Sequence, residues 1–182
     1  MSLELLGGRI LAPWFGSSIY VWGSIITVFM LSLSVGYFIG GRLSLHSPSL
    51  AKFGCMFLVA AAILVPVIYL AEPVMIWVFD RIEDPRYGSL AASLVLFVAP
   101  TVVLGMISPY SVRLLVRRTE ESGKVAGTLY FVSTLGSALG TLATSFYFVL
   151  WFEMDTIVAV LAGTLLLLGT VGIVCRGLDR HA

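Results

Sequence analysis

The side chains best able to bind or react near a membrane lie in the first ten residues. Glu4 and Arg9 stand among apolar residues in the opening stretch MSLELLGGRILAPWFGSS. A carboxylate and a guanidinium in such surroundings could pair with each other or together hold a polar ligand. They could equally anchor the stretch at the membrane surface, with Arg9 at the lipid headgroups. The sequence leaves both interpretations open.

Four further residues are candidates for ligand binding. Arg113 could face an anionic group or a cytoplasmic partner, or it could serve only as a basic anchor on the cytoplasmic side. Tyr130, Ser133 and Thr134 place hydroxyl groups in the middle of a long apolar stretch. These hydroxyls could line a polar pocket, or they could bridge to a neighbouring helix, as hydroxyls inside membranes commonly do.

No catalytic, metal or cofactor site is predicted. His46 and His181 are far apart, and Cys55 and Cys175 lie in separate apolar segments, which favours small hydrophobic residues over a disulfide or a metal pair. Ion-coupled transporters usually carry an ionisable residue inside the helix bundle, and the predicted spans contain no charged residue except Lys124 at the start of the fourth. A nucleic-acid partner is not expected.

The composition around these residues is that of a membrane protein. Apolar residues make up 59% of the chain and charged residues 12%, whereas soluble domains carry about 25% charged residues. Mean hydropathy is +1.02. We therefore predict an all-α fold, a polytopic transmembrane helical bundle that forms one domain over residues 1–182 and contacts the lipid bilayer.

Five stretches are apolar and long enough to cross a bilayer, which takes roughly 20 residues. The residues before the first stretch are too few and too polar to span, and they are predicted to form an interfacial or partial helix. Pro66 and Pro100 fall inside spans and predict kinks. The five spans lie near residues 19–41, 53–71, 89–107, 124–152 and 156–175.

The longest polar connection, between the second and third spans, has a helical pattern of its own. Met75, Val78, Phe79 and Ile82 share one helical face, and the acidic and basic residues lie mostly elsewhere. This pattern predicts a short amphipathic helix on the membrane surface.

The span 124–152 is predicted to be the helix around which the others pack. Small residues four apart let membrane helices approach closely, and this span carries two such ridges. The first span carries a third ridge. The predicted packing residues are Ser32, Gly36 and Gly40 in the first span, and Gly127, Gly136, Ser137, Gly140, Thr141 and Thr144 in the fourth.

The charges of the connections predict an orientation. Arg and Lys gather in cytoplasmic loops. The connections that follow the first and third spans are basic, and in the latter Arg117 and Glu121 are spaced to pair on a helix. The turn after the fourth span is acidic, with Glu153 and Asp155. We expect a multi-pass protein of the cell (inner) membrane with a cytoplasmic C-terminus.

Two blocks of the sequence resemble the membrane region of the fused major-facilitator/spermidine-synthase-like family. One is ELLGGRILAPWFGSS followed by a span that ends in GYFIGGRL, and the other is SPYSVRL followed by SGKVAGTLYFVSTLGSALGTL. The blocks cover most of the chain through the fourth span. The resemblance implies a six-helix membrane region followed by a cytoplasmic aminopropyltransferase-like domain.

The chain departs from that pattern. It starts at what resembles the latter part of the family's first helix, and it ends soon after the last span, so the synthase-like domain is expected to be missing. Ser44 and Leu45 stand where facilitator-type loops usually carry an acidic residue, and Ser133 stands where the family block carries asparagine. The first departures remove the basis for catalysis by this chain alone, and the last two weaken transport of the facilitator type.

Two functions follow from these observations. The first is a non-catalytic binding or scaffold subunit that forms a homo-oligomer or assembles with a separate cytoplasmic synthase-like protein. The second is a transporter of small, polyamine-like molecules that works as a dimer of half-units. An enzyme that acts alone is the least favoured interpretation.

Overall fold

The protein is a bundle of helices. We describe it from a computed structural model that covers residues 1–116 and 118–179. Five helices are long and apolar enough to cross a membrane, and no strand occurs among the described residues. The predicted all-α, multi-span fold is therefore confirmed. In chain order the elements are α1 (Ser2–Phe15), α2 (Ile19–Leu43), α3 (Leu50–Phe79), α4 (Pro85–Leu115), η1 (Thr119–Glu121), α5 (Ser122–Ala143), η2 (Thr144–Phe148), α6 (Val149–Trp151) and α7 (Met154–Asp179).

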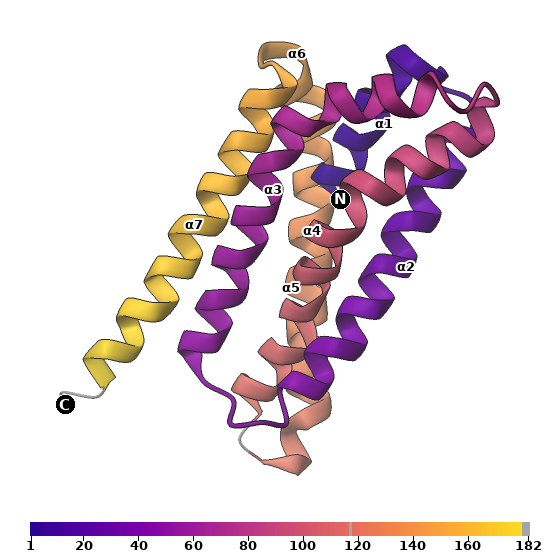
Figure 1. Ribbon diagram of the computed structural model, residues 1–182. Coiled ribbons are helices and arrows are strands. Elements are labelled where there is room, and N and C mark those ends of the chain that lie inside the picture. Colours follow the sequence, from indigo (N-terminus) through magenta and orange to yellow (C-terminus); the bar gives the residue numbers. More distant parts are fainter. Residues whose placement is uncertain (117, 180–182) are drawn as a thin grey trace.

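The long helices alternate in direction, so the connections fall at two ends of the bundle (Figure 1). The α2–α3 and α4–α5 connections lie at the same end as the C-terminus. The described basic residues of these two connections are Arg42, Lys52, Arg113, Arg118 and Lys124. The two basic connections and the C-terminus, which the sequence predicts to share one side of the membrane, thus lie at the same end of the bundle. Arg117, and with it the predicted pair with Glu121, lies outside the described residues, as do Arg180 to Ala182 and the side chains of Cys175 and Arg176.

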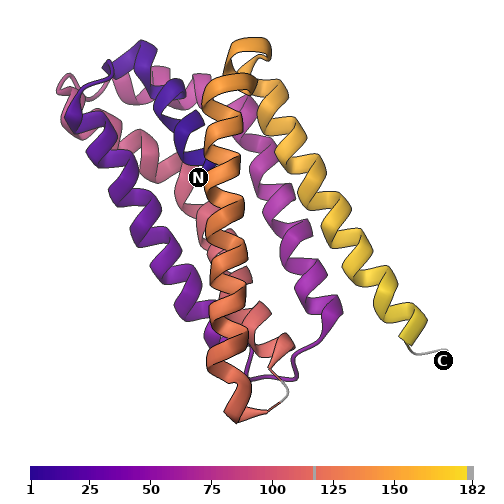
Figure 2. The same ribbon diagram turned by 180° about the vertical axis from the view of Figure 1, so that it is seen from behind.

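The first helix is a partial helix that is inserted into the bundle. The N-terminus lies inside the outline of the bundle, beside α5 (Figure 2). A Cβ on Gly8 would lie 2.6 Å from the Trp22 ring of α2, and one on Gly7 would lie 3.2 Å from the Phe97 ring of α4. After α1 the chain reverses at Gly16, whose φ of 75° favours glycine. The prediction of an interfacial or partial helix is thus resolved as a partial helix with a buried face.

Helices α3 and α4 are longer than the spans predicted within them. With 30 and 31 residues and a rise of 1.5 Å per residue, each is about 45 Å long, more than the roughly 30 Å of bilayer hydrocarbon. Ser49 and Asp84 cap their N-termini by accepting hydrogen bonds from Lys52 N and Arg86 N. The predicted spans end before the nearest charged residues. The helices continue past these residues, because a charged side chain is compatible with a helix that extends out of the hydrocarbon into water.

The predicted amphipathic surface helix is instead the continuation of α3. This last part of α3 follows Pro66 and Pro73 and turns across the end of the bundle in Figure 1. Met75 and Val78 on its apolar face are buried in the protein core. The ring of Phe79 lies 5.8 Å from that of Trp14 in α1. The apolar face therefore packs on α1 rather than on lipid, because α1 covers it.

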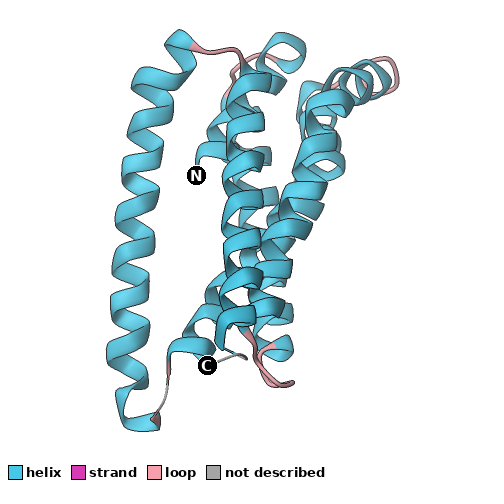
Figure 3. Cartoon of the chain, turned by 90° about the vertical axis from the view of Figure 1, so that its left-hand side faces the viewer, coloured by secondary structure: helices cyan, strands magenta, loops and turns pink. Residues whose placement is uncertain are grey.

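Helix α5 stands apart from the rest of the bundle. Figure 3 shows it separated along most of its length, with the N-terminus between it and the other helices. None of its residues is buried. The predicted central helix is therefore a peripheral helix within the described chain, attached mainly at its two ends and by α1.

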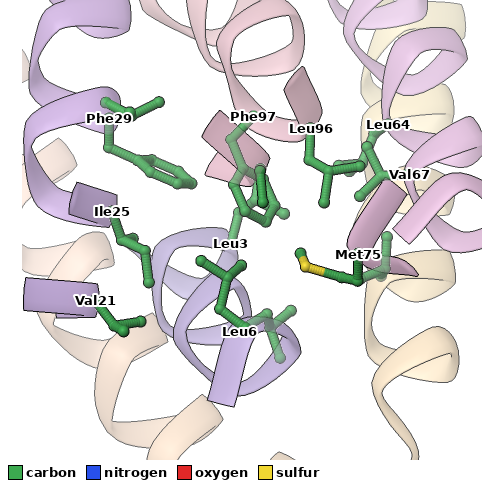
Figure 4. Close-up of a cluster of buried hydrophobic side chains, with 14 of the residues drawn as sticks. Leu3, Leu6, Val21, Ile25, Phe29, Leu64, Val67, Met75, Leu96 and Phe97 are labelled. Atoms are coloured by element: carbon green, nitrogen blue, oxygen red, sulfur yellow. The ribbon is translucent and has the colours of Figure 1, made fainter. Parts of the chain in front are cut away.

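The core is formed by side chains of α7 and, mainly, of the four helices α1, α2, α3 and α4. Side chains from these four helices converge around Leu3 and Leu6, with Phe29 and Phe97 in contact from α2 and α4, their ring centroids 5.4 Å apart (Figure 4). Burial of such side chains is worth about 1.5–3 kcal/mol each in water, but lipid tails are equally apolar, so packing carries the stability here.

Two pairs of helices approach closely through glycines. In the α2–α4 pair, a Cβ on Gly36 or Gly40 would collide with the backbone of α4, at Val102 and Met106. In the α3–α7 pair, a Cβ on Gly54 would lie 2.6 Å from the carbonyl oxygen of Gly169. At these two contacts backbone touches backbone, and they hold α2 against α4 and α3 against α7.

Candidate functional site

A cavity separates α5 from the bundle, and we call it the α5 cavity. Its volume is about 630 Å³, within the range of roughly 300–1,000 Å³ typical of small-molecule sites. Residues of α1, α3, α4, α5 and α7 line it. They are Met1, Ser2, Leu3, Phe57, Leu64, Leu104, Ser133, Gly136, Ser137, Gly140, Leu161, Thr164, Leu165 and Leu168.

The lining is mainly apolar with a few hydroxyl groups. Thr164 donates its hydroxyl proton to the carbonyl oxygen of Val160, 2.8 Å away in its own helix. Ser133 and Ser137, one helical turn apart on α5, have no hydrogen-bond partner among the described residues. Gly136 leaves open space, since a Cβ there would meet nothing within 4 Å. The cavity therefore offers two free hydroxyl groups on an otherwise apolar wall.

One end of the cavity is closed by hydrogen bonds between α1 and the α5 side. Ser2 donates to the carbonyl oxygen of Gly140, at 3.4 Å, and accepts from Thr144 Oγ1, at 2.9 Å. Arg9 Nη1 donates to the carbonyl oxygen of Val149, 3.2 Å away. Thr144 begins η2, a π-helix, and such widened turns recur at functional sites. These bonds tie α5 to the bundle through α1.

The structure separates the two charged candidates of the opening stretch. Five residues apart on a helix, Glu4 and Arg9 point about 140° away from each other around the axis. Arg9 bonds to Val149, as above. Glu4 is half-buried, has no hydrogen bond or ion pair among the described residues, and does not line the α5 cavity. Of the alternatives left open by the sequence, an ion pair between Glu4 and Arg9 is therefore not formed in the described chain.

The other binding candidates lie at different places. Ser133 lines the α5 cavity, whereas Tyr130, which is 56% exposed, and Thr134 point elsewhere on α5. Arg113 is exposed in the last turn of α4. Of the candidates named from sequence, the structure brings only Ser133 to the cavity, together with the packing candidates Gly136, Ser137 and Gly140.

The predicted packing residues divide into two groups. Ser32, Gly36 and Gly40 are buried on α2. On α5 and η2, only Thr144 is buried, and a Cβ on Gly127 would meet nothing within 4 Å. Thr141 is half-buried. The ridges of α5 therefore have no tightly packed neighbour within the described chain, because α1 and the α5 cavity occupy the space beside them.

Sequence reasoning missed four glycines at the close helix contacts, which are Gly54, Gly105, Gly169 and Gly172. Gly105 lies opposite Gly36, while Gly54 lies opposite Gly169 and Gly172. None of these glycines repeats at a four-residue step within its own helix, so the ridge pattern does not reveal it. The spacing of Gly169 and Gly172 by three residues was the one signal available.

The charged and metal-binding side chains add no second centre. Among the described residues no three His, Cys, Asp or Glu side chains come together, and the one ion pair joins Arg86 Nε and Asp84 Oδ1 at the N-terminus of α4, at 3.9 Å. No protein-family model matches the chain, and no curated protein or solved structure was found to be similar to it.

Proposed function

We propose that this membrane protein is a non-catalytic binding subunit that holds a mostly apolar molecule in the α5 cavity. The observation that carries the proposal is the cavity itself, about 630 Å³ between α5 and the bundle. Small ligands are usually held in apolar pockets by a few well-placed polar groups. Ser133 and Ser137 would be those groups, with their free hydroxyls directed to a donor or acceptor on the ligand.

The charge of the lining favours this ligand class over a polyamine. A polyamine carries several positive charges, and removing them from water without counter-charges is costly. The described lining residues include no Asp or Glu side chain. The alternative function, a polyamine-like transporter that works as a dimer of half-units, has no support from the lining.

The resemblance to the membrane region of the fused major-facilitator/spermidine-synthase-like family extends the proposal to a partner. We infer that a second copy or a separate cytoplasmic synthase-like protein completes the functional unit. The exposure of α5 supports a second copy, since large apolar side chains such as Phe131, Leu135 and Leu142 have no partner that buries them in the described chain. Crosslinking in native membranes followed by native mass spectrometry tests it. A single species at monomer mass, with no adduct, would exclude both partners.

A matched pair of α5 variants tests the ligand. Gly136→Leu places an isobutyl group in the cavity, and Gly127→Leu adds the same group where a Cβ also meets nothing. The protein is purified from native membranes in a mild detergent, and bound small molecules are identified by native mass spectrometry. We expect an apolar molecule on the wild type and on Gly127→Leu, and its loss from Gly136→Leu.

Two results would contradict the proposal. Equal occupancy of Gly136→Leu and Gly127→Leu would show that the ligand lies outside the cavity. Uptake of radiolabelled spermidine into proteoliposomes, abolished by Gly136→Leu and not by Gly127→Leu, would replace binding by transport.

A further inference from the structure

A groove separate from the α5 cavity lies at the N-terminal end of α5, and we call it the α4–α5 groove. It is formed by the end of α4 and the first turns of α5, and its volume is about 590 Å³. It shares no lining residue with the α5 cavity. The lining residues are Leu115, Glu121, Lys124, Val125, Thr128, Leu129 and Val132.

The length of the groove along α5 matches the thickness of one membrane leaflet. From Glu121 to Val132 the helix rises about 16 Å, at 1.5 Å per residue. Half of a bilayer's hydrocarbon is about 15 Å. Beyond the first turn the wall is apolar apart from Thr128, whose hydroxyl donates to the carbonyl oxygen of Lys124 at 2.9 Å. An acyl chain therefore matches the groove in length and in polarity.

Two opposite charges stand at the mouth of the groove. Glu121 and Lys124 both line it and are three residues apart, yet no ion pair within 4.0 Å joins them in the described chain. Neither side chain has a hydrogen-bond partner among the described residues. Both are exposed at the end of the span. Within the part of the chain that the structure describes, the groove thus presents an unpaired carboxylate and an unpaired ammonium to one headgroup.

We propose that the α4–α5 groove binds a phospholipid whose headgroup carries a primary ammonium, such as phosphatidylethanolamine. Lys124 Nζ donates to the lipid phosphate, and the lipid ammonium donates to the Glu121 carboxylate. One acyl chain lies along Leu115, Leu129 and Val132. A choline headgroup has no N–H to donate to Glu121, and a glycerol headgroup carries no positive charge. Lipids with these headgroups should therefore bind the groove more weakly than one with an ethanolamine headgroup.

Lipid titration of the purified full chain tests the headgroup. Phosphatidylethanolamine, phosphatidylcholine and phosphatidylglycerol with identical acyl chains are compared by native mass spectrometry. An exposed charge pair contributes up to about 1 kcal/mol, so the expected preference for ethanolamine is roughly two- to fivefold. Equal binding of the three lipids, or a preference for choline, would overturn the proposal.

Single variants test which group of the lipid headgroup each of the two charged side chains binds. Lys124→Ala should weaken both ethanolamine and glycerol lipids, and Glu121→Gln should abolish only the preference for ethanolamine over glycerol. Arg42→Ala and Glu83→Gln remove exposed charges away from the groove and serve as controls. A preference that survives Glu121→Gln would refute the assignment of the ammonium.

A third variant separates this site from the α5 cavity. Val132 is 60% exposed at the inner end of the groove. Val132→Trp should reduce binding of all three lipids, whereas Gly136→Leu should change none of them. Loss of lipid in Gly136→Leu alone would place the lipid in the α5 cavity and contradict this proposal.

Discussion

Gly36 of α2 lies directly against Gly105 of α4, so that a Cβ on Gly36 would be 2.9 Å from the Gly105 Cα atom. The approach is mutual, since a Cβ on Gly105 would be 3.2 Å from the Gly36 Cα atom. Neither glycine can gain a side chain without moving a helix. This contact between parallel neighbours, rather than the ridges of α5, is where small residues determine the packing of the described chain.

The first prediction concerns this contact. Gly36→Leu should push α2 and α4 apart and lower the free energy of unfolding by at least about 1–3 kcal/mol, the usual cost of overpacking. Gly23→Leu, on the same helix, is the control, because a Cβ there meets nothing within 4 Å. Thermal melts in mild detergent measure both. Equal melting temperatures for the two variants would show that the helices are not in contact at Gly36.

The second prediction separates two glycines of α5 that the sequence treats alike. A Cβ on Gly140 would lie 3.4 Å from Ser2 Oγ, and one on Gly136 would meet nothing. Gly140→Leu should therefore displace Ser2 and cost roughly 0.5–1.5 kcal/mol, about one hydrogen bond, whereas Gly136→Leu should leave the melting temperature of the ligand-free protein unchanged. If both variants melt early, another helix, such as one from a second copy, packs on this face.

The third prediction concerns the hydrogen bond between Thr144 and Ser2. Thr144→Val removes the buried donor with little change of shape, and Ser2→Ala removes its acceptor. A double-mutant cycle should give a coupling of about 0.6–1.7 kcal/mol, as found for polar contacts between membrane helices. Thr134→Val, at an exposed position of α5, should change nothing. Strictly additive effects would mean that the two hydroxyls do not interact.

The fourth prediction is the orientation in the membrane. The basic connections lie at the same end as the C-terminus (Figure 1), and basic loops face the cytoplasm. A fluorescent reporter fused to the C-terminus should therefore be active in the cytoplasm. A periplasm-active enzyme fused at the same place should be inactive. The reverse pattern would invert the orientation.

The sequence predicted the number and type of the spans because length and hydropathy are properties of each helix alone. It did not predict which helix would be central. The small residues Gly136 and Gly140 permit another helix to approach α5 closely. Which helix does so depends on how all the helices pack together, and this is not encoded in α5 alone. The glycine that meets Gly36 is Gly105, and nothing within α4 marks it.

The same limit explains the first helix and the candidate site. With 14 residues α1 is too short to span, and its burial depends on the rings of Trp22 and Phe97, which lie in other helices. Ser133 was identified from its place in an apolar stretch. The α5 cavity was not, because a cavity is a property of five elements together and has no signature in any one of them.

The hydrogen bonds of Ser2 impose an order on the assembly of the protein. Its partners Gly140 and Thr144 lie 138 and 142 residues further along the chain. During synthesis at about 5–20 residues per second, those partners emerge roughly 7–28 seconds after Ser2. Until then the Ser2 hydroxyl lacks both partners, although Leu3 and Leu6 can already pack against α2, α3 and α4. The hydrogen bonds that join α1 to α5 and η2 are therefore among the last contacts of the bundle to form.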